Sequence, residues 1–226
     1  MSKDSVIIID YGSGNLRSAE RACAHMIQER GLSADVKISN KPQDIANATR
    51  IILPGQGAFG DCIENLRGID GMIEALEDAV LKKSAPFLGI CVGMQLMATR
   101  GLEHGVHGGL DWISGEVVPF QTDDPDLKIP HMGWNDLVLP MSSAQDNTPP
   151  QLKSIKTQDG GGEHYYFVHS FVFKCDYNHH VLAMCNYGGL FAAIVGRDNM
   201  MGVQFHPEKS SDSGLRLIGD FLEWAP

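Results

Sequence analysis

Basic residues are in short supply in this chain. Its 226 residues include 18 Lys and Arg against 28 Asp and Glu, which gives a formal net charge of −10. A surplus of negative charge repels phosphate groups, so it argues against nucleic acid or an anionic membrane as a partner. No apolar run approaches the roughly 20 residues that a membrane-spanning helix needs, and the first residues lack the layout of a signal peptide. We therefore expect no membrane contact and a cytoplasmic location.

Closely spaced cysteines are also missing. The number of cysteines is odd, and no Cys-x-x-Cys pair occurs. This spacing argues against a disulfide framework and against a zinc site, and it is typical of a reducing compartment. We expect no metal and no cofactor, so a reactive thiol has to be recognised from its local sequence. The cysteines are Cys23, Cys62, Cys91, Cys175 and Cys185.

Strand and helix patterns alternate through the first half of the chain. Apolar runs over residues 6–10, 34–38, 50–53 and 87–90 are typical of buried strands, and helical patterns lie between several of them. This alternation predicts an α/β fold with a largely parallel central sheet flanked by helices. With 43% hydrophobic residues, the chain is long enough to bury one large core. We expect a single domain over residues 1–226.

The second half is expected to add antiparallel strands. Short apolar runs follow one another closely there, separated by turns rich in Gly, Pro and Asn. A polar segment over residues 143–162 is expected to be an exposed loop, and a closing helix is expected after Ser211. The strands are predicted over residues 115–120, 135–139, 165–173, 181–185, 191–195 and 200–205.

The residues around Cys91 form the most informative local pattern. An expected strand over residues 87–90 leads into it, an expected helix over residues 94–100 follows, and Gly89 and Gly93 flank it. A strand that turns sharply into a helix crowds the backbone, and glycine relieves that crowding. Such a turn places the thiol at the N-terminus of the helix, where free N–H groups favour a thiolate. The alternative is a buried core cysteine, the commoner role of a free Cys in an apolar run.

His206 is a candidate base for this cysteine. It ends an expected strand, and Pro207 biases its backbone toward an extended conformation. In an extended chain Glu208 lies on the same side as His206, where a carboxylate can hold the imidazole in one tautomer. The alternative is a His-Pro turn followed by a surface Glu.

An attack by a thiol on a carbonyl group also needs hydrogen-bond donors, which stabilise the oxyanion that forms. The backbone N–H of Val92 is one candidate. The backbone of Gly55, Gln56 and Gly57 follows another expected strand at the same edge of the sheet, and it is a second candidate. The alternatives are an ordinary glycine-rich turn or a phosphate-binding loop, although the Lys-Ser/Thr of a P-loop is missing.

These stretches together resemble a known family. Gly-Ile-Cys-Val-Gly-Met-Gln over residues 89–95, with His-Pro-Glu over residues 206–208, resembles the triad-type class I glutamine amidotransferases. Residues 11–18, 130–135 and 166–171 are similar to the glutaminase subunits of imidazole glycerol phosphate synthases, in histidine biosynthesis. The resemblance runs from about residue 6 to about residue 224.

The resemblance implies a flavodoxin-like fold and a glutaminase mechanism. Cys91 attacks the carboxamide of glutamine, His206 gives a proton to the departing ammonia and then activates water, and Glu208 orients His206. The γ-glutamyl thioester hydrolyses to glutamate. Residues 55–57 match the oxyanion strand, whose peptide is expected to flip, and Gln56 stands where the family often has an apolar residue. Four residues match positions that hold the amino-acid end of glutamine: Gln95, Glu103, Ser170 and Phe171.

The resemblance also implies a partner. The family docks, as a heterodimer, on a cyclase subunit with a (β/α)8 barrel, which uses the ammonia to make imidazole glycerol phosphate and the aminoimidazole-carboxamide ribotide AICAR. For Trp134 the alternative is a core position, and His131 and His169 are expected to be structural. Four residues match family positions at the interface: Asn15, Trp134, Tyr166 and Lys209.

Other functions stay open at this point. One is the glutaminase subunit of a related synthase, such as one of an aminosugar pathway. Another is a hydrolase of γ-glutamyl peptides or a cysteine peptidase, which would leave Gln95 without a role. A third is a non-catalytic partner-binding module, which would be expected to have lost Cys91, His206 or Glu208, although all three are present.

Overall fold

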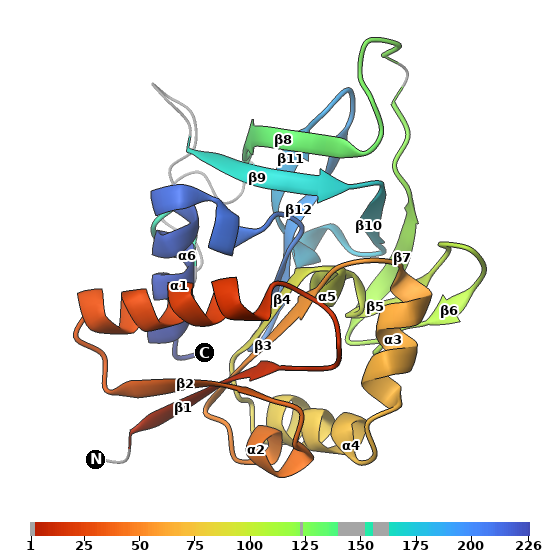
Figure 1. Ribbon diagram of the computed structural model, residues 1–226. Coiled ribbons are helices and arrows are strands. Elements are labelled where there is room, and N and C mark those ends of the chain that lie inside the picture. Colours follow the sequence, from red (N-terminus) through yellow and green to blue (C-terminus); the bar gives the residue numbers. More distant parts are fainter. Residues whose placement is uncertain (1–2, 123, 140–151, 156–162) are drawn as a thin grey trace.

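Three β-sheets make up the strand structure of the part of the chain that the computed structural model describes, which is residues 3–122, 124–139, 152–155 and 163–226. The central sheet has seven strands in the order β11-β12-β13-β4-β3-β1-β2 (Figure 1). Its interior strands are buried on both faces, which explains why they appear in the sequence as continuous apolar runs. The seven strands are β1 (Asp4–Ile9), β2 (Ala34–Ser39), β3 (Arg50–Gly55), β4 (Phe87–Cys91), β11 (Val181–Asn186), β12 (Leu190–Arg197) and β13 (Met200–Val203).

The pairing of these strands confirms the predicted fold class. The strands β2, β1, β3, β4 and β13 pair parallel with one another in that order. At the other edge, β12 pairs antiparallel with β13 and with β11. The first half of the chain therefore builds most of the parallel part of the sheet, and the second half adds β13 to it and supplies the antiparallel edge. The carboxyl ends of β3 and β4 lie next to each other, because Gly55 pairs with Cys91.

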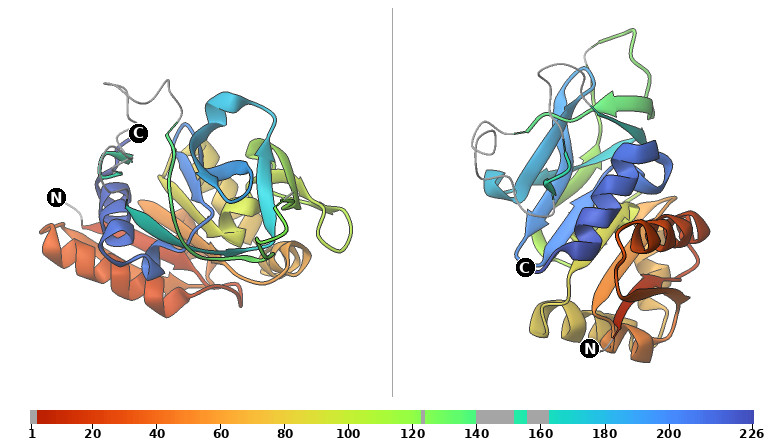
Figure 2. Two further views of the ribbon diagram at one scale, coloured as in Figure 1. Left: turned by 90° about the horizontal axis from the view of Figure 1, so that it is seen from above. Right: turned by 90° about the vertical axis from the view of Figure 1, so that its left-hand side faces the viewer.

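Helices cover the central sheet. The two longest, α1 (Leu16–Glu29) and α6 (Ser211–Glu223), pack side by side (Figure 2). The others are shorter and include α2 (Pro42–Ala46), α3 (Phe59–Arg67) and α4 (Met72–Glu77), which continues as a π-helical turn over Asp78–Lys82. No helix among the described residues combines the length and the apolar character needed to cross a membrane.

Two smaller sheets lie beside the carboxyl ends of the central strands (Figure 1). One has the order β10-β7-β5-β6 and is formed by β10 (Phe171–Cys175), β7 (Ile113–Pro119), β5 (Ala98–Gly101) and β6 (His107–Gly108). The other is the antiparallel pair of β8 (His131–Asp136) and β9 (His164–His169). The backbone N–H of His206 donates to the carbonyl of Tyr166 at 2.9 Å, which ties β9 to the central sheet.

The predicted helix after Cys91 is wrong over most of its length. The helix α5 spans only Val92–Gln95, and residues 98–101 form the strand β5 instead. Buried Ala98 and Gly101 enclose two exposed residues, and β5 pairs with β6 and β7, so tertiary pairing overrides the helical pattern. The single strand predicted over residues 165–173 is also divided, because Ser170 separates β9 from β10.

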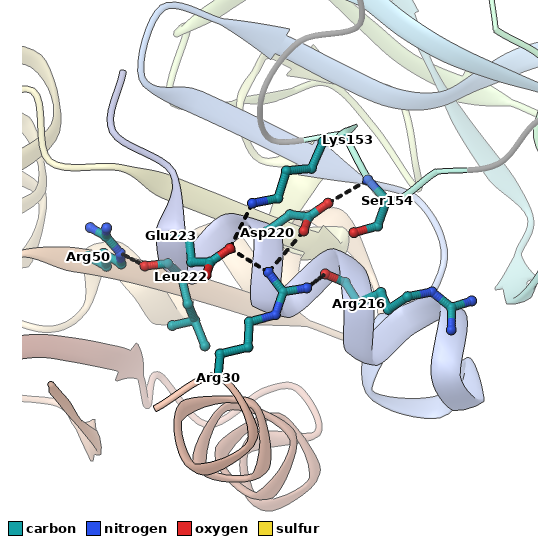
Figure 3. Close-up of polar contacts among 8 residues, drawn as sticks. All are labelled: Arg30, Arg50, Lys153, Ser154, Arg216, Asp220, Leu222 and Glu223. Carbon is teal, nitrogen blue, oxygen red and sulfur yellow. Dashed lines mark hydrogen bonds and ion pairs between the residues drawn. The ribbon is translucent and has the colours of Figure 1, made fainter. Parts of the chain in front are cut away.

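The expected exposed loop over residues 143–162 falls mostly outside the described residues. Within residues 152–155, Lys153 is exposed as expected, but Leu152 is fully buried and Ile155 nearly so, so the prediction is wrong for these two residues. The reason is a polar network that holds the segment against α6 (Figure 3). Ser154 N–H donates to Asp220 Oδ2 at 2.7 Å, and Lys153 Nζ lies 2.7 Å from Glu223 Oε2.

Arg30 is the centre of the same network and joins α1 to α6 (Figure 3). Its guanidinium lies 3.0 Å from Asp220 Oδ1 and 2.7 Å from Glu223 Oε2, and it also donates to the carbonyl of Arg216 at 3.1 Å. The Asp220 side chain is completely buried, and its carboxylate is therefore paired and hydrogen-bonded rather than isolated.

Candidate active site

Cys91 lies at a sharp turn between β4 and α5. Its φ angle is +55°, a left-handed conformation that is costly for a residue other than glycine. The flanking glycines are sterically required, because a Cβ on Gly93 would lie 1.8 Å from the carbonyl oxygen of Leu53 and one on Gly89 would lie 2.6 Å from the carbonyl oxygen of Gly93. The crowding inferred from the sequence is therefore present. However, α5 is so short that its dipole favours a thiolate less than the longer helix expected from the sequence.

A cavity of about 400 Å³ opens beside Cys91. The thiol itself is nearly buried, with 5% of the residue exposed. The cavity brings together predicted residues from five separate stretches of the chain. Three of them follow β3, β4 and β13 at the carboxyl edge of the central sheet, and the other two lie in or next to strands of the smaller sheets beside that edge. The predicted residues in its walls are Gln56, Gly57, Cys91, Val92, Gln95, Glu103, Ser170, Phe171, His206 and Lys209.

His206 and Glu208 are in direct contact. His206 Nδ1 lies 2.9 Å from Glu208 Oε1, and both side chains are almost completely buried. The predicted backbone conformation behind this contact was wrong, because residues 207–209 form a 3-10 turn and not an extended chain. The turn brings the carboxylate back onto the imidazole. A surface position for Glu208, the alternative considered from the sequence, is excluded by its 2% side-chain exposure.

The charge state of His206 follows from its neighbours. Burial alone lowers its pKa, but the hydrogen bonds with Cys91 and Glu208, together with the negative charges of these two groups, outweigh burial and raise the pKa to about 10. With its pKa raised to this value, His206 is an imidazolium at neutral pH. An imidazolium in this position can give a proton to a leaving group.

Asn15 contacts the same carboxylate. Its Nδ2 donates to Glu208 Oε1 at 3.3 Å, a contact that was not expected of a residue placed at the partner interface. Glu208 Oε2 has no hydrogen-bond partner within the described residues. Asn15 follows β1, and since β1 is parallel to β3 and β4, its carboxyl end lies at the same edge of the sheet.

The backbone N–H of Gln56 is already engaged. It donates to Ser13 Oγ at 3.0 Å, and Ser13 Oγ donates in turn to the carbonyl oxygen of Gln56 at 2.6 Å. The same carbonyl accepts a bond from Cys62 Sγ at 3.3 Å. In this structure the Gln56 N–H therefore points to Ser13 and is not available to an oxyanion beside Cys91. Sequence analysis assigned no role to Ser13, although it lies within the family-like stretch of residues 11–18, and none to Cys62, which lies in no motif.

Gln95 is held in place by two acceptors. Its Nε2 donates to Gln204 Oε1 at 3.0 Å and to the carbonyl oxygen of Phe171 at 3.2 Å. Gln204 is fully buried, and its own Nε2 donates to Cys91 Sγ at 3.8 Å. Sequence analysis missed Gln204, although its position two residues before His206 was a usable signal. Glu103 lines the cavity and accepts the Phe59 N–H at the start of α3, at 2.8 Å.

Three of the four residues expected at a partner interface, Trp134, Tyr166 and Lys209, form an aromatic and basic group at the surface. Trp134 is 52% exposed, which excludes the core position considered as an alternative. Its ring packs edge-on against Tyr166, with the ring centroids 5.9 Å apart. Lys209 Nζ lies 6.0 Å from the centroid of the same Tyr166 ring, and Lys209 also borders the cavity. Met132, on the same side of β8 as Trp134, is 61% exposed.

Within the ranges that the structure describes, no three His, Cys, Asp or Glu residues are grouped closely enough to hold a metal ion. All five cysteines are free.

Comparison with known proteins gives a consistent result. The family model for glutamine amidotransferase class-I matches residues 7–223. A protein from Agrobacterium fabrum named imidazole glycerol phosphate synthase subunit HisH is 52% identical over 221 residues, which is 98% of this chain and 99% of that protein. A protein of the same name from Cereibacter sphaeroides is 51% identical over 220 residues, covering 97% and 99% of the two chains.

Solved structures of lower identity share the fold. A glutamine amidotransferase crystal structure aligns with a TM-score of 0.64 at 19% identity, over 94% of this chain and 98% of that one. A glutamine amidotransferase from Thermotoga maritima aligns with a TM-score of 0.62 at 14% identity, over 99% and 98%. At such identities these two structures support the fold and no more.

Proposed function

The chain belongs to the class I glutamine amidotransferases, and we propose that it is the glutaminase subunit of an imidazole glycerol phosphate synthase in histidine biosynthesis. Support comes from relatives with that name that match at about half identity over nearly the whole of both chains. We take residues 1–226 as one amidotransferase domain, since the family model spans all but the ends.

In the proposed reaction, the Cys91 thiolate attacks the carboxamide carbon of glutamine. His206, held as an imidazolium, gives its proton to the departing ammonia, and a γ-glutamyl thioester forms on Cys91. The neutral imidazole then takes a proton from water, which hydrolyses the thioester to glutamate and restores the imidazolium. The 2.9 Å contact between Glu208 Oε1 and His206 Nδ1 supports a role for Glu208 in keeping the other ring nitrogen toward the thiol.

The oxyanion of each tetrahedral intermediate needs two donors in this account. The Val92 N–H is the first, because α5 begins at Val92 and the first N–H groups of a helix lack partners within it. The second comes from the backbone of residues 55–57 after rotation of the peptide. The bonds between Ser13 and Gln56 hold this strand in a resting state, so the isolated chain is expected to be a slow glutaminase.

We place the partner on the surface that carries Trp134, Tyr166 and Lys209. Exposed aromatic side chains are typical anchors of protein interfaces, and Lys209 lies between this surface and the cavity. The proposed partner is a cyclase subunit with a (β/α)8 barrel. Ammonia in bulk water at neutral pH is mostly protonated and then is no nucleophile, so direct transfer between the two subunits preserves its reactivity.

The observation that carries the proposal is the strained, cavity-facing Cys91 beside the buried His206–Glu208 pair. The test is to measure glutamate release by the chain alone, with a cyclase subunit, and with the cyclase and its nucleotide ligand. We expect low activity alone and a large increase when both are added. Full activity without a partner would count against gating at residues 55–57. Stimulation only by the acceptor synthase of an aminosugar pathway would assign the chain to a different complex.

A further inference from the structure

Two buried histidines lie next to the cavity without a role in the mechanism above. His131 on β8 and His169 on β9 are directly paired in the strand register and are only 2% and 6% exposed. His131 Nδ1 lies 3.1 Å from His169 Nε2. His169 also forms part of the cavity wall, so this pair connects β8 to the proposed glutamine site.

Both rings are neutral at neutral pH. Burial lowers the pKa of His131 to about 4 and, with the nearby ring of His131 acting in the same direction, lowers that of His169 to about 3. The surroundings of His131 are aromatic, since it stacks on Tyr187 and on Phe167 with centroid distances of 4.0 and 4.9 Å. A neutral imidazole has one donor and one acceptor nitrogen. Once one nitrogen of a ring is known to donate, the other must accept, and this fixes the role of the nitrogen that faces it on the neighbouring ring.

The contacts allow a single assignment of the protons. His169 Nδ1 lies 3.0 Å from the carbonyl oxygen of Phe171, which only accepts, so Nδ1 must carry the proton of His169. His169 Nε2 is then bare and accepts from His131 Nδ1–H. His131 Nε2 is bare in turn, and it faces Asn135 Nδ2 at 3.4 Å, a longer contact in which the amide donates.

The chain of hydrogen bonds from Asn135 through His131 and His169 continues into the proposed glutamine site. The carbonyl oxygen of Phe171 accepts from His169 Nδ1–H and from Gln95 Nε2–H, which uses both of its lone pairs. The second hydrogen of Gln95 Nε2 goes to Gln204, and Gln204 donates to Cys91 Sγ. Each of the two hydrogens on Gln95 Nε2 has one acceptor, the Phe171 carbonyl or Gln204 Oε1. The position of the Phe171 carbonyl therefore helps to set the orientation of the Gln95 side chain.

We propose that His131 and His169 are positioning residues for glutamine binding. With the proton of each ring on Nδ1, the pair fixes the Phe171 carbonyl and, through it, the side chain of Gln95. This proposal rests on the proposed function and on the expectation, implied by the family resemblance, that Gln95 and residues 170–171 receive the amino-acid end of glutamine. Neither histidine reaches the substrate itself, so loss of the pair affects glutamine affinity more than the chemical step.

The first test is read on the wild-type protein, and two variants serve only to assign its signals. The full-length protein is labelled with 15N-histidine, and the ring nitrogen shifts are recorded by NMR between about pH 6 and pH 8. We expect two rings that stay neutral throughout, each with the proton on Nδ1, assigned by the signals that disappear in His131→Phe and His169→Phe. A proton on Nε2 of either ring, or titration of either ring in this range, would overturn the proposed hydrogen-bond order.

The second test separates positioning from structure. His131→Phe keeps a stacked ring between Tyr187 and Phe167 but removes the donor to His169. In the complex with the cyclase subunit we expect the KM for glutamine to rise about 5- to 30-fold while kcat changes less than about threefold. The control is Tyr187→Phe, which keeps the same stack and loses only a hydroxyl bonded to the carbonyl of Lys128. Its KM should stay at the wild-type value.

The outcomes keep the two proposals apart. A wild-type complex that does not hydrolyse glutamine contradicts the proposed function, whereas the NMR result is unaffected by it. An active wild-type complex with an unchanged KM in His131→Phe contradicts the positioning role alone. A kcat loss with unchanged KM contradicts it as well, because it would place the pair in the chemical step.

Discussion

Ser13→Ala is expected to activate the isolated chain. In the resting structure Ser13 Oγ accepts the Gln56 N–H at 3.0 Å and donates to the Gln56 carbonyl at 2.6 Å. Both bonds must break before this peptide can rotate and present an N–H to an oxyanion beside Cys91. Removing the hydroxyl therefore destabilises the resting arrangement, while the rotated one loses no known contact with Ser13.

The size of the effect can be worked from these two bonds. A net contribution of about 0.5–1.5 kcal/mol is usual for one hydrogen bond, and Gln56 is exposed, so the lower part of that range applies to each. Together they favour the resting state by about 1–2 kcal/mol, and their loss increases the rotated population about 5- to 30-fold. Glutamate release by the isolated chain should rise by the same factor, whereas the rate in the complete complex should change little.

Two variants serve as comparisons. Cys62→Ala removes the thiol contacts with the Gln56 carbonyl at 3.3 Å and with Ser13 Oγ at 3.4 Å, but leaves both bonds between Ser13 and Gln56, and should activate less. Ser33→Ala removes an exposed hydroxyl away from the site and should have no effect. If Ser13→Ala leaves the isolated activity unchanged while the protein stays folded, the Ser13 contacts do not hold the resting state, and the reasoning is refuted.

Three further predictions concern acid stability, docking and folding. In the folded protein the pKa values of His131 and His169 are lowered to about 4 and about 3, whereas a histidine in the unfolded chain has a pKa of about 6.5. The free energy of unfolding therefore falls as the pH is lowered below about 6.5, because the unfolded chain binds protons that the folded protein does not. Each histidine lowers the free energy of unfolding by about 1.4 kcal/mol for each pH unit of acidification in this range. In urea unfolding, His131→Phe should therefore reduce the loss of stability between about pH 6.5 and pH 5 by about 2 kcal/mol. Trp134→Ala should weaken cyclase binding in calorimetry by about 30-fold or more, as expected of an interface anchor, whereas Tyr177→Ala, which truncates another ring that is 54% exposed, should not. Arg30→Ala leaves the buried Asp220 carboxylate without its cation and should lower the free energy of unfolding by about 3 kcal/mol; an additional Asp220→Ala change should then cost less than it does alone.

Local backbone requirements were predictable from the sequence. The glycines beside Cys91 indicated a sharp turn, and the structure places Cys91 at φ +55° between β4 and α5. The apolar runs likewise located the central strands, because a strand buried on both faces leaves no polar positions. The helix expected over residues 94–100 was wrong because its last residues pair with β7, a contact between distant segments that local periodicity does not record.

The missed site residues share a different cause. Ser13 and Gln204 reach Gln56 and Cys91 only through the pairing of distant strands. The contact of Asn15, a residue expected at the partner interface, with Glu208 arises in the same way. A polar side chain in a turn has the same local signature whether it faces solvent or a buried carboxylate. The structure therefore adds the supporting contacts, whereas the nucleophile and its base were identifiable from motif and spacing. Their catalytic roles stay predictions until tested.

The most direct test of the account uses Cys91→Ala in complex with the cyclase subunit. Two rates are measured on the same preparation: glutamate release from glutamine, and synthesis of imidazole glycerol phosphate with ammonium salt as the nitrogen source. We predict that glutamate release is lost and that ammonia-dependent synthesis continues at the wild-type rate, since that step belongs to the partner. Glutamate release that persists in Cys91→Ala would contradict the assignment of Cys91 as the nucleophile, and with it the central claim.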